Sequence, residues 1–367
     1  MPNKYKYFPQ NKDELIKLVS NKKIKLSNID ISRVNDFSEL FSKSQRTDFS
    51  GIENWNVSHV INMEKMFSSA EYFNSDLNNW NVSNVKNMSG MFSYAVEFNG
   101  NISLWDTSKV EDMSEMFEGA KNFNQNIGNW NVSKVIDMSG MFNYAVSFNQ
   151  DISLWDTSCL ENANFMFAGA KSFNQDISKW NISNLKYMTS MFNRADLFNQ
   201  DLSCWNVSHA QSLAYMFFKA KNFNQDLSLW QINRECMTDK MFSESSVEKP
   251  PFWYCNKEYY NNQNERTKGI KDKYVPLTNR ELIAVANNND IPLKEIDVQY
   301  VSDFSNIFAY SERQDFSGIE DWNVSHVTDM TDMFCSAECE NLPSWYDENK
   351  WEEYETVIRI KTDEQQD

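Results

Sequence analysis

The chain contains 367 residues, of which 35 are basic and 52 acidic, so its formal net charge at pH 7 is −17. So large a negative charge argues against nucleic acid or an anionic membrane surface as the main partner. Hydrophobic residues make up 41% of the chain, which argues against general disorder. Only 9 glycines and 7 prolines are present, which excludes collagen-like sequences and long Gly/Ser linkers.

The beginning of the chain has no recognisable targeting signal. No apolar stretch follows Met1–Phe8, and no segment approaches the roughly 18 apolar residues of a membrane-spanning helix. We therefore expect a cytoplasmic protein without membrane insertion; the alternative is a cell-surface protein whose signal sequence has been removed. The 6 cysteines have no regular spacing, so free thiols are expected rather than a disulfide framework.

Residues 1–47 are expected to form an N-terminal cap. The segment around Glu14-Leu15-Ile16 predicts an amphipathic helix. Residues 29–41 follow as a degenerate coil of the repeat described next, with Ile29 in the place of a tryptophan. A stack of repeats needs such an element to shield its open end.

Residues 48–244 contain a repeat with a period of 25 residues, in which four series of residues stay in phase. Tryptophan recurs at Trp55, Trp80, Trp105, Trp130, Trp155, Trp180, Trp205 and Trp230. Phe-Asn pairs begin at Phe73, Phe98, Phe123, Phe148, Phe173, Phe198 and Phe223. Met-Phe pairs and an alanine keep the same period, as at Met91-Phe92 and Ala95. No chance composition gives four such series, so a solenoid of stacked coils is predicted.

One coil spans residues 73–97. We expect a short strand near Trp80 and Val82, which alternate with polar residues, and a short helix over 88–95, where apolar residues recur at helical spacing. The predicted fold class is an α/β repeat solenoid of leucine-rich-repeat-like coils, each with one short strand and one short helix, capped at both ends. The positions expected to face inward are Phe73, Leu77, Trp80, Val82, Val85, Met88, Met91, Phe92 and Ala95.

Two further columns of polar residues follow the same period. The asparagine after each phenylalanine, such as Asn74, is expected to form a buried ladder that satisfies turn backbone, which would explain turns with little glycine. An aspartate column is interrupted by Asn101 and Asn126, and we interpret it as turn chemistry rather than as a calcium site. Its members are Asp76, Asp151, Asp176, Asp201 and Asp226.

The repeat resembles a known family. The segment Phe148-Asn149-Gln150-Asp151-Ile152-Ser153-Leu154-Trp155-Asp156 is similar to the most specific motif of the BspA-like leucine-rich-repeat proteins of bacteria. The resemblance extends over residues 28–242 and 295–338. It implies a leucine-rich-repeat fold, and the family includes many surface proteins and lipoproteins of unknown activity.

The end of the chain repeats its beginning. Residues 12–71 recur at 279–338 with a constant offset of 267, and Pro251-Phe252-Trp253-Tyr254 resembles Pro343-Ser344-Trp345-Tyr346. We therefore expect two capped modules, the second with a single tryptophan coil at Trp322. The predicted segments are an N-terminal cap at 1–47, the repeat solenoid at 48–244, a C-terminal cap at 245–260, a linker at 261–277, a second N-terminal cap with one repeat at 278–338, and a second C-terminal cap with an acidic tail at 339–367.

The sequence contains no recognised catalytic or nucleotide-binding motif. His59, His209 and His326 occupy one variable repeat position, where exposed side chains are expected that cannot meet in a site. We therefore expect no enzyme activity, no metal and no cofactor. The alternative is an enzyme with its site in the terminal caps, which contain no histidine.

The residue before each tryptophan is the predicted binding position. If the tryptophan points inward, its neighbour points outward, and the successive coils would then present an apolar stripe. The alternative is that neighbouring side chains or a cap cover this stripe. The candidate partner-binding residues are Leu104, Asp106, Leu154, Asp156, Lys179, Cys204 and Leu229.

The sequence predicts a non-enzymatic scaffold that binds a protein of unknown identity. An intracellular binder, for instance of the immunity type, would suit the acidic charge and the expanded repeats. A bacterial cell-surface adhesin is the alternative that the family resemblance favours.

Overall fold

The computed structural model describes residues 5–227, 230, 232–233, 236–247, 251, 254, 274–276, 279–311, 313–337, 339 and 342–347. The chain divides into two compact units, one formed by Met1–Gln225 and Trp230–Lys249 and the other by Asp226–Leu229 and Pro250–Asp367. Each unit is described separately below.

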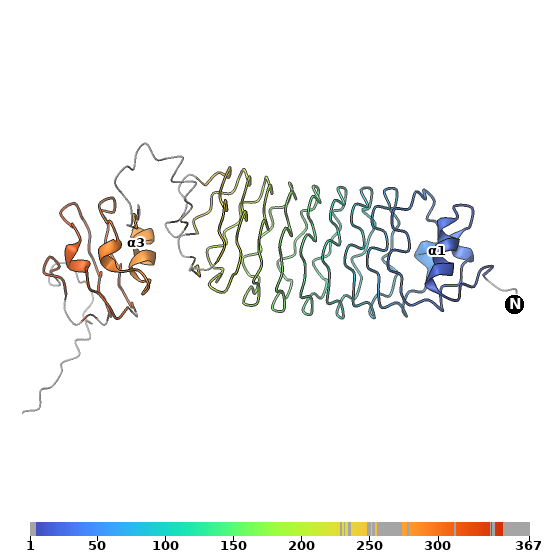
Figure 1. The fold of residues 1–367 in the computed structure, drawn as a ribbon, viewed down its shortest axis with the longest axis horizontal. Coiled ribbons are helices and arrows are strands. Elements are labelled where there is room, and N and C mark those ends of the chain that lie inside the picture. The colour runs from blue at the N-terminus through green and yellow to red at the C-terminus, as the bar shows by residue number, and fades with distance from the viewer. Residues whose placement is uncertain are drawn as a thin grey trace, which may run out of the picture. The chain divides into compact units, whose positions relative to one another are not determined.

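The first unit begins with helix α1, Lys12–Ser20, at the end of its stack of coils (Figure 1). The side chain of Asn11 caps the helix by accepting a hydrogen bond from the backbone N–H of Glu14 at 3.0 Å. Leu15 and Val19, one helical turn apart, are buried. The amphipathic cap helix expected from the sequence therefore lies at this position. Two short 3₁₀ helices follow, η1 at Leu26–Asn28 and η2 at Ile52–Asn54.

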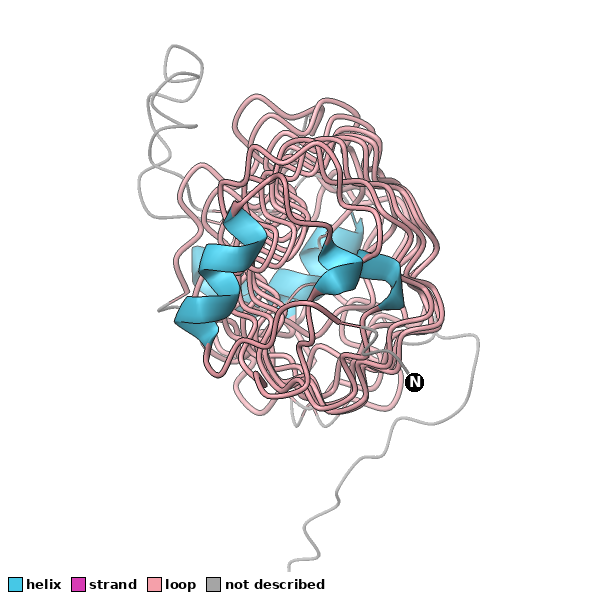
Figure 2. Cartoon of the chain, turned by 90° about the vertical axis from the view of Figure 1, so that its right-hand side faces the viewer, coloured by secondary structure: helices cyan, strands magenta, loops and turns pink. Residues whose placement is uncertain are grey.

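The coils that follow contain neither the short strand nor the short helix expected in each of them. Between η2 and α3 the described residues include no helix, and Figure 2 draws the coils as loops and turns. An α-helix over 88–95 is impossible because Gly90 and Tyr94 have φ angles of +57° and +54°. Neighbouring coils are joined by isolated parallel bridges, such as Asn87 to Asp112, rather than by strands near the tryptophans. The apolar spacing of this segment reflects two tight turns, which bring the same residues to one side.

Backbone hydrogen bonds in this segment alternate between two directions. Every second N–H donates to a carbonyl of the next coil: Met88 to Asp112, Gly90 to Ser114, Phe92 to Met116 and Tyr94 to Glu118, at 2.5–3.0 Å. The N–H groups between them close turns within the coil: Met91 to Met88, Ser93 to Gly90 and Ala95 to Phe92, at 3.0–3.1 Å. Gly90 is the third residue of the turn 88–91, and Tyr94 is the third residue of the turn 92–95. This third position requires a positive φ in turns of this kind. Backbone bonds therefore fix the spacing of the coils along the stack.

The interior is a set of stacked aromatic and methionine columns. All nine positions predicted to face inward in residues 73–97 are buried, with exposed fractions of 0–3%. Phe92 stacks on two rings of the next coil, Phe98 at 3.9 Å and Phe117 at 5.7 Å between ring centroids. Each described repeat tryptophan donates its indole N–H to a carbonyl of the preceding coil, as Trp105 does to Leu77 at 2.9 Å. Each coil therefore buries its apolar side chains only by stacking on its neighbours.

The asparagine ladder exists, but its side chains are exposed or half-buried rather than buried. From Asn74 to Asn199, each Oδ1 accepts the backbone N–H of the next asparagine in the ladder at 2.8–3.1 Å. The glutamine that follows, such as Gln125, donates its Nε2 to the same oxygen. Amide side chains therefore link the coils where the backbone does not reach.

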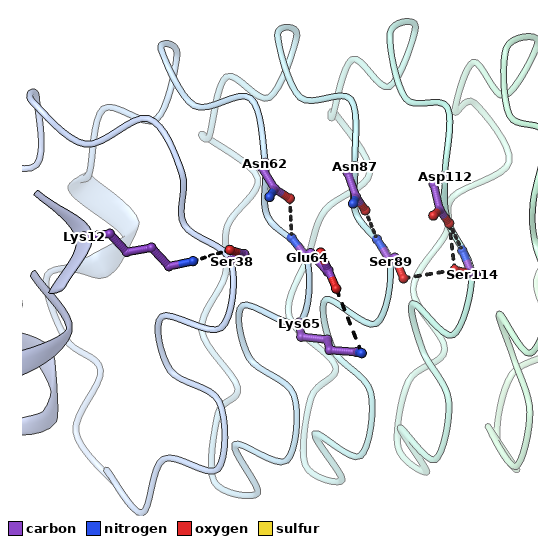
Figure 3. Close-up of polar contacts among 9 residues, drawn as sticks. All are labelled: Lys12, Ser38, Asn62, Glu64, Lys65, Asn87, Ser89, Asp112 and Ser114. Atoms are coloured by element: carbon purple, nitrogen blue, oxygen red, sulfur yellow. Dashed lines mark hydrogen bonds and ion pairs between the residues drawn. The ribbon is translucent and has the colours of Figure 1, made fainter.

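A second column of polar side chains lies beside the bridges (Figure 3). Asn62 and Asn87 each accept the backbone N–H two residues later, at 3.0 Å and 2.8 Å, which closes a local turn. Ser114 donates to Ser89 at 2.9 Å, and Lys12 of α1 donates to Ser38. The bond of Lys12 joins the cap helix to the first coil, and the bond of Ser114 joins two later coils on the same face.

The second unit contains helix α3 at Asn279–Ala286 and 3₁₀ helices η3 at Leu293–Glu295 and η4 at Ile319–Asp321. Its core includes Leu293, Phe304, Phe308, Trp322 and Phe334. Parallel bridges join Tyr274 to Ile296 and Asp303 to Asp329. The elements lie at the offset of 267 residues from α1, η1 and η2, so the repeated sequence has the same local structure. The predicted linker, apart from residues 274–276, and most of the predicted C-terminal caps lie outside the described residues.

Candidate binding surfaces

Among the described residues, the one before each repeat tryptophan is exposed, as the stripe predicted from the sequence requires. Leu104 and Leu154 expose 75% and 83% of their surface, while Trp105 and Trp155 beside them are 3% exposed. The two leucines lie two coils apart, with the exposed Asn129 at the same position in the coil between them. The structure therefore presents isolated leucines on alternate coils rather than one continuous stripe.

Two carboxylates border these leucines. Asp106 and Asp156 are exposed, and each accepts the backbone N–H two residues later, from Ser108 at 3.0 Å and Ser158 at 3.1 Å. Hydrogen bonds from these serines lower the pKa of both carboxyl groups. Both aspartates are therefore charged at neutral pH beside the exposed leucines.

The remaining predicted residues lie further along the same column. Lys179 and Cys204 are exposed, and Cys204 borders a shallow recess of about 370 Å³ that is also lined by Trp180, Trp205 and His209. The Sγ atom of Cys204 lies 3.4 Å from the carbonyl oxygen of Ser178. Leu229 lies outside the described residues.

The three histidines are half-buried rather than exposed. The Nε2 atom of His59 lies 3.1 Å and 3.0 Å from the carbonyl oxygens of Ile31 and Val34. His209 and His326 make equivalent contacts with the preceding coils, at 2.8–3.0 Å. The ring therefore satisfies backbone groups of the neighbouring coil.

The aspartate column is part of the turns, as its interpretation from the sequence proposed. Asp151 and Asp176 each accept the backbone N–H of a serine two residues later at 2.9 Å, and these hydrogen bonds lower their pKa. Asn101 and Asn126 make the same bond at 3.0 Å. Among the residues that the structure describes, no three His, Cys, Asp or Glu side chains are grouped as a metal site would require.

A second surface, which the sequence analysis missed, combines tyrosines with glutamates. We define the aromatic–acidic patch as Tyr94, Glu115, Glu118 and Tyr144. Tyr94 and Tyr144 are 49% and 47% exposed, and Tyr94 donates its hydroxyl to Glu118 Oε1 at 3.2 Å. Asn143 donates its Nδ2 to the same oxygen at 2.9 Å.

Glycines form the floor beneath these side chains. A Cβ atom built on Gly119 would lie 2.6 Å from the ring of Tyr94, and one on Gly169 would lie 2.7 Å from the ring of Tyr144. The Tyr–Gly pair occurs twice at this position, 50 residues apart, at Tyr94/Gly119 and Tyr144/Gly169. It is a sequence signal that could have located the patch, because each of these tyrosine rings lies over a glycine of the next coil.

The charges in the patch are not balanced by a nearby cation. Burial raises the pKa of Glu118, and the neighbouring Glu115 raises it further. Burial raises the pKa of Tyr94, as do the charges of Glu118 and Glu115. Neither Glu115 nor Glu118 forms an ion pair with a lysine or arginine of the described residues.

The geometry defines a protein built from stacked 25-residue coils. Residues 11–109, 100–201, 152–252 and 279–358 each match the family described as Mycoplasma protein of unknown function, DUF285. These matches cover most of the chain, so the chain belongs to this family, and their succession identifies it as a repeat protein. Neither the curated proteins nor the solved structures contain a match to it. None of the helices within the described residues is long and apolar enough to span a membrane.

Proposed function

We propose that the chain is a non-enzymatic scaffold that binds a protein partner through the column containing Leu104 and Leu154. The observation that supports it is the exposure of these two leucines, at 75% and 83%, on a regular stack of coils. Moving a leucine side chain from water into an apolar contact is favourable by roughly 1.5–3 kcal/mol of free energy. Two such residues can therefore contribute substantially to the stability of an interface. Asp106 and Asp156 beside them would add polar contacts at its rim.

The rigidity of the backbone supports the same proposal. Hydrogen bonds between coils and the stacked interior hold the exposed leucines in place before any partner arrives. Binding to a preorganised surface loses less conformational entropy than binding to a mobile loop. Repeat stacks offer extended surfaces of this kind.

The absence of an enzyme activity is part of the proposal. It is supported by the lack of a catalytic motif in the sequence and by the engagement of His59, His209 and His326 with backbone carbonyls. An intracellular binder, for instance of the immunity type, is the biology that the negative charge favours. The resemblance to the BspA-like proteins and their leucine-rich-repeat fold favours a surface adhesin instead.

The test is quantitative affinity capture from extracts of the source cells. The tagged chain is compared with a Leu104→Asp/Leu154→Asp variant and with an Asn129→Asp control, which changes the same position of the intervening coil. We expect the double variant to lose one or more partners that the wild type and the control retain. Equal recovery of every protein by all three chains would remove this column as the binding surface.

A further inference from the structure

We propose that the aromatic–acidic patch of Tyr94, Glu115, Glu118 and Tyr144 docks a lysine- or arginine-bearing segment of a partner protein. This surface goes beyond the proposed function, because Glu115 lies 11 residues from Leu104 along the chain, nearly half a coil away. Its chemistry also differs, since it combines aromatic rings with carboxylates rather than exposing aliphatic side chains.

The shape of the patch suits a side chain laid over it. Tyr94 lies against Gly119, and Glu115 lies against Gly140, where an added Cβ atom would be 3.5 Å from the glutamate Cγ. Because the glycines have no side chains, the tyrosine and the glutamate lie low over the backbone of the next coil. Tyr144 is close enough for its hydroxyl to influence the pKa of Tyr94. Two half-exposed rings and two carboxylates therefore share one face.

The charge of the patch is complementary to a lysine or arginine side chain. Glu115 and Glu118 repel one another, and the hydrogen bonds that Tyr94 and Asn143 donate to Glu118 neutralise none of its charge. A cation that approaches would relieve this repulsion and would also be attracted to the negative faces of the tyrosine rings. The formal charge of −17 would attract a basic segment from a distance.

The chain contains an internal example of an ammonium group beside both a ring and a carboxylate. Lys219 occupies the same coil position as Tyr94 and Tyr144. Its Nζ atom lies 4.9 Å from the ring centroid of Phe218 and 3.2 Å from Oε1 of Glu244 in the next coil. This face of the stack can therefore hold an ammonium group between an aromatic ring and a carboxylate. In the aromatic–acidic patch the ring and carboxylates are present, and the partner would supply the cation.

The experiment measures the binding of a fluorescent ten-residue oligolysine peptide to the full chain at low salt. A Glu115→Gln/Glu118→Gln variant is expected to bind about five- to tenfold more weakly, and Tyr144→Leu at least about twofold more weakly. The matched control is Asp151→Asn/Asp176→Asn, which changes the net charge equally and preserves its turns, because Asn101 and Asn126 make the same bonds.

Circular dichroism and thermal unfolding establish that each variant is folded before its affinity is compared. The proposal is supported if the control binds like the wild type while both patch variants bind more weakly. It is overturned if the glutamine pair binds like the wild type, or if the control loses as much affinity. It is also overturned if Tyr144→Leu is folded and binds unchanged, since the rings would then play no part.

Discussion

At the scale of single residues, the coils depend on backbone conformations that most side chains avoid. Lys65, Tyr94, Glu115, Tyr144 and Phe165 all have φ angles between +51° and +58°. Such conformations cost roughly 1–2 kcal/mol for a residue with a Cβ atom. The hydrogen bonds between coils compensate for this cost. Turns made by asparagine and aspartate therefore explain only part of the low glycine content. Ordinary residues in left-handed positions also contribute to it.

The packing of Tyr94 on Gly119 can be separated from the backbone strain of a left-handed glycine. Gly140→Ala adds only strain, because its new Cβ meets nothing closer than 3.5 Å, and should lower the free energy of unfolding by about 1 kcal/mol. Gly119→Ala should lower the free energy of unfolding by more than Gly140→Ala does, since its Cβ would lie 2.6 Å from the Tyr94 ring. Denaturant unfolding measures both.

A double-mutant cycle supplies the control for this comparison. The background is Tyr94→Ser, which copies Ser69 at the same coil position. In this background, Gly119→Ala should lower the free energy of unfolding by no more than Gly140→Ala does. An undiminished cost in that background would mean that the tyrosine is not the obstacle.

Glu118 should make stability depend on pH in a direction opposite to that of the turn aspartates. Its pKa is raised in the folded state, so its contribution is fully present below the unfolded pKa and is lost as the pH rises through the folded pKa. Glu118→Gln, which retains an acceptor for Tyr94, should therefore be more stable than the wild type at pH 7 and equal to it near pH 4. Urea unfolding at the two pH values tests this.

Glu71→Gln is the matched control, because Glu71 is an exposed glutamate outside the patch. It should change stability by less than about 0.5 kcal/mol at either pH. The same stability difference for Glu118→Gln at pH 4 and pH 7 would contradict the assignment of its raised pKa.

At the scale of elements, a buried arginine completes each N-terminal cap. Arg46 is 3% exposed, and its guanidinium donates to the carbonyl oxygens of Val19, Asn21, Ile24 and Asp48 at 2.9–3.4 Å. Burial lowers its pKa, which the charge of Asp48 partly offsets. The guanidinium therefore satisfies carbonyls at the end of α1 and in the loop after it.

Arg313 repeats this arrangement in the second unit. It is 2% exposed and donates to Ala286, Asn288 and Ile291 at 2.8–2.9 Å, and to Asp315. These acceptors are the residues at the offset of 267 from those of Arg46. The arginine is thus a defining feature of the cap, and its presence in both copies was a signal that the sequence analysis overlooked.

Removal of this arginine should loosen the cap. Arg46→Ala leaves four buried or partly buried carbonyls without their donor, so we expect a loss of about 3 kcal/mol of stability and faster amide hydrogen exchange in α1. Arg33→Ala is the control, since Arg33 is exposed in the same cap and should cost less than about 0.5 kcal/mol. Equal effects of the two substitutions would show that the buried arginine does not hold the cap.

At the scale of the whole molecule, four successive coils of the first unit alternate between tyrosine and glycine at one position. Tyr94 and Tyr144 lie on alternate coils, with Gly119 and Gly169 on the coils that receive them. Leu104 and Leu154 follow the same period of 50 residues. The pairing of tyrosine with glycine gives this alternation a physical cause, because each tyrosine ring lies where a side chain of the next coil would begin.

Deletion of single coils tests this period. Deleting residues 125–149 preserves the contact of Tyr94 with Gly119, whereas deleting residues 100–124 places Tyr94 against Tyr144. Each deletion removes 25 residues in frame. The second variant should unfold about 2–4 °C below the first, as expected for roughly 1 kcal/mol in a domain of this size. Identical melting temperatures would show that the alternation has no structural role.

The sequence allowed the inward positions, the cap helices and the exposure of Leu104 and Leu154 to be predicted, because these follow from apolar periodicity. The helix expected over 88–95 was wrong, since tight turns at Gly90 and Tyr94 place apolar residues at the same spacing. Bonds across coils, such as those of Arg46 and His59, join residues 25–28 positions apart. Such contacts depend on how the coils stack, so local patterns do not reveal them.

The central claim, that the column of Leu104 and Leu154 is a binding surface, is tested most directly by hydroxyl-radical footprinting. Oxidation of each side chain is measured by mass spectrometry for the free chain and for the chain captured with its partners from source-cell extract. We predict that Leu104 and Leu154 become protected, while Ile136, which is 50% exposed at another coil position, keeps its reactivity. Unchanged oxidation of both leucines in the captured complex would contradict it.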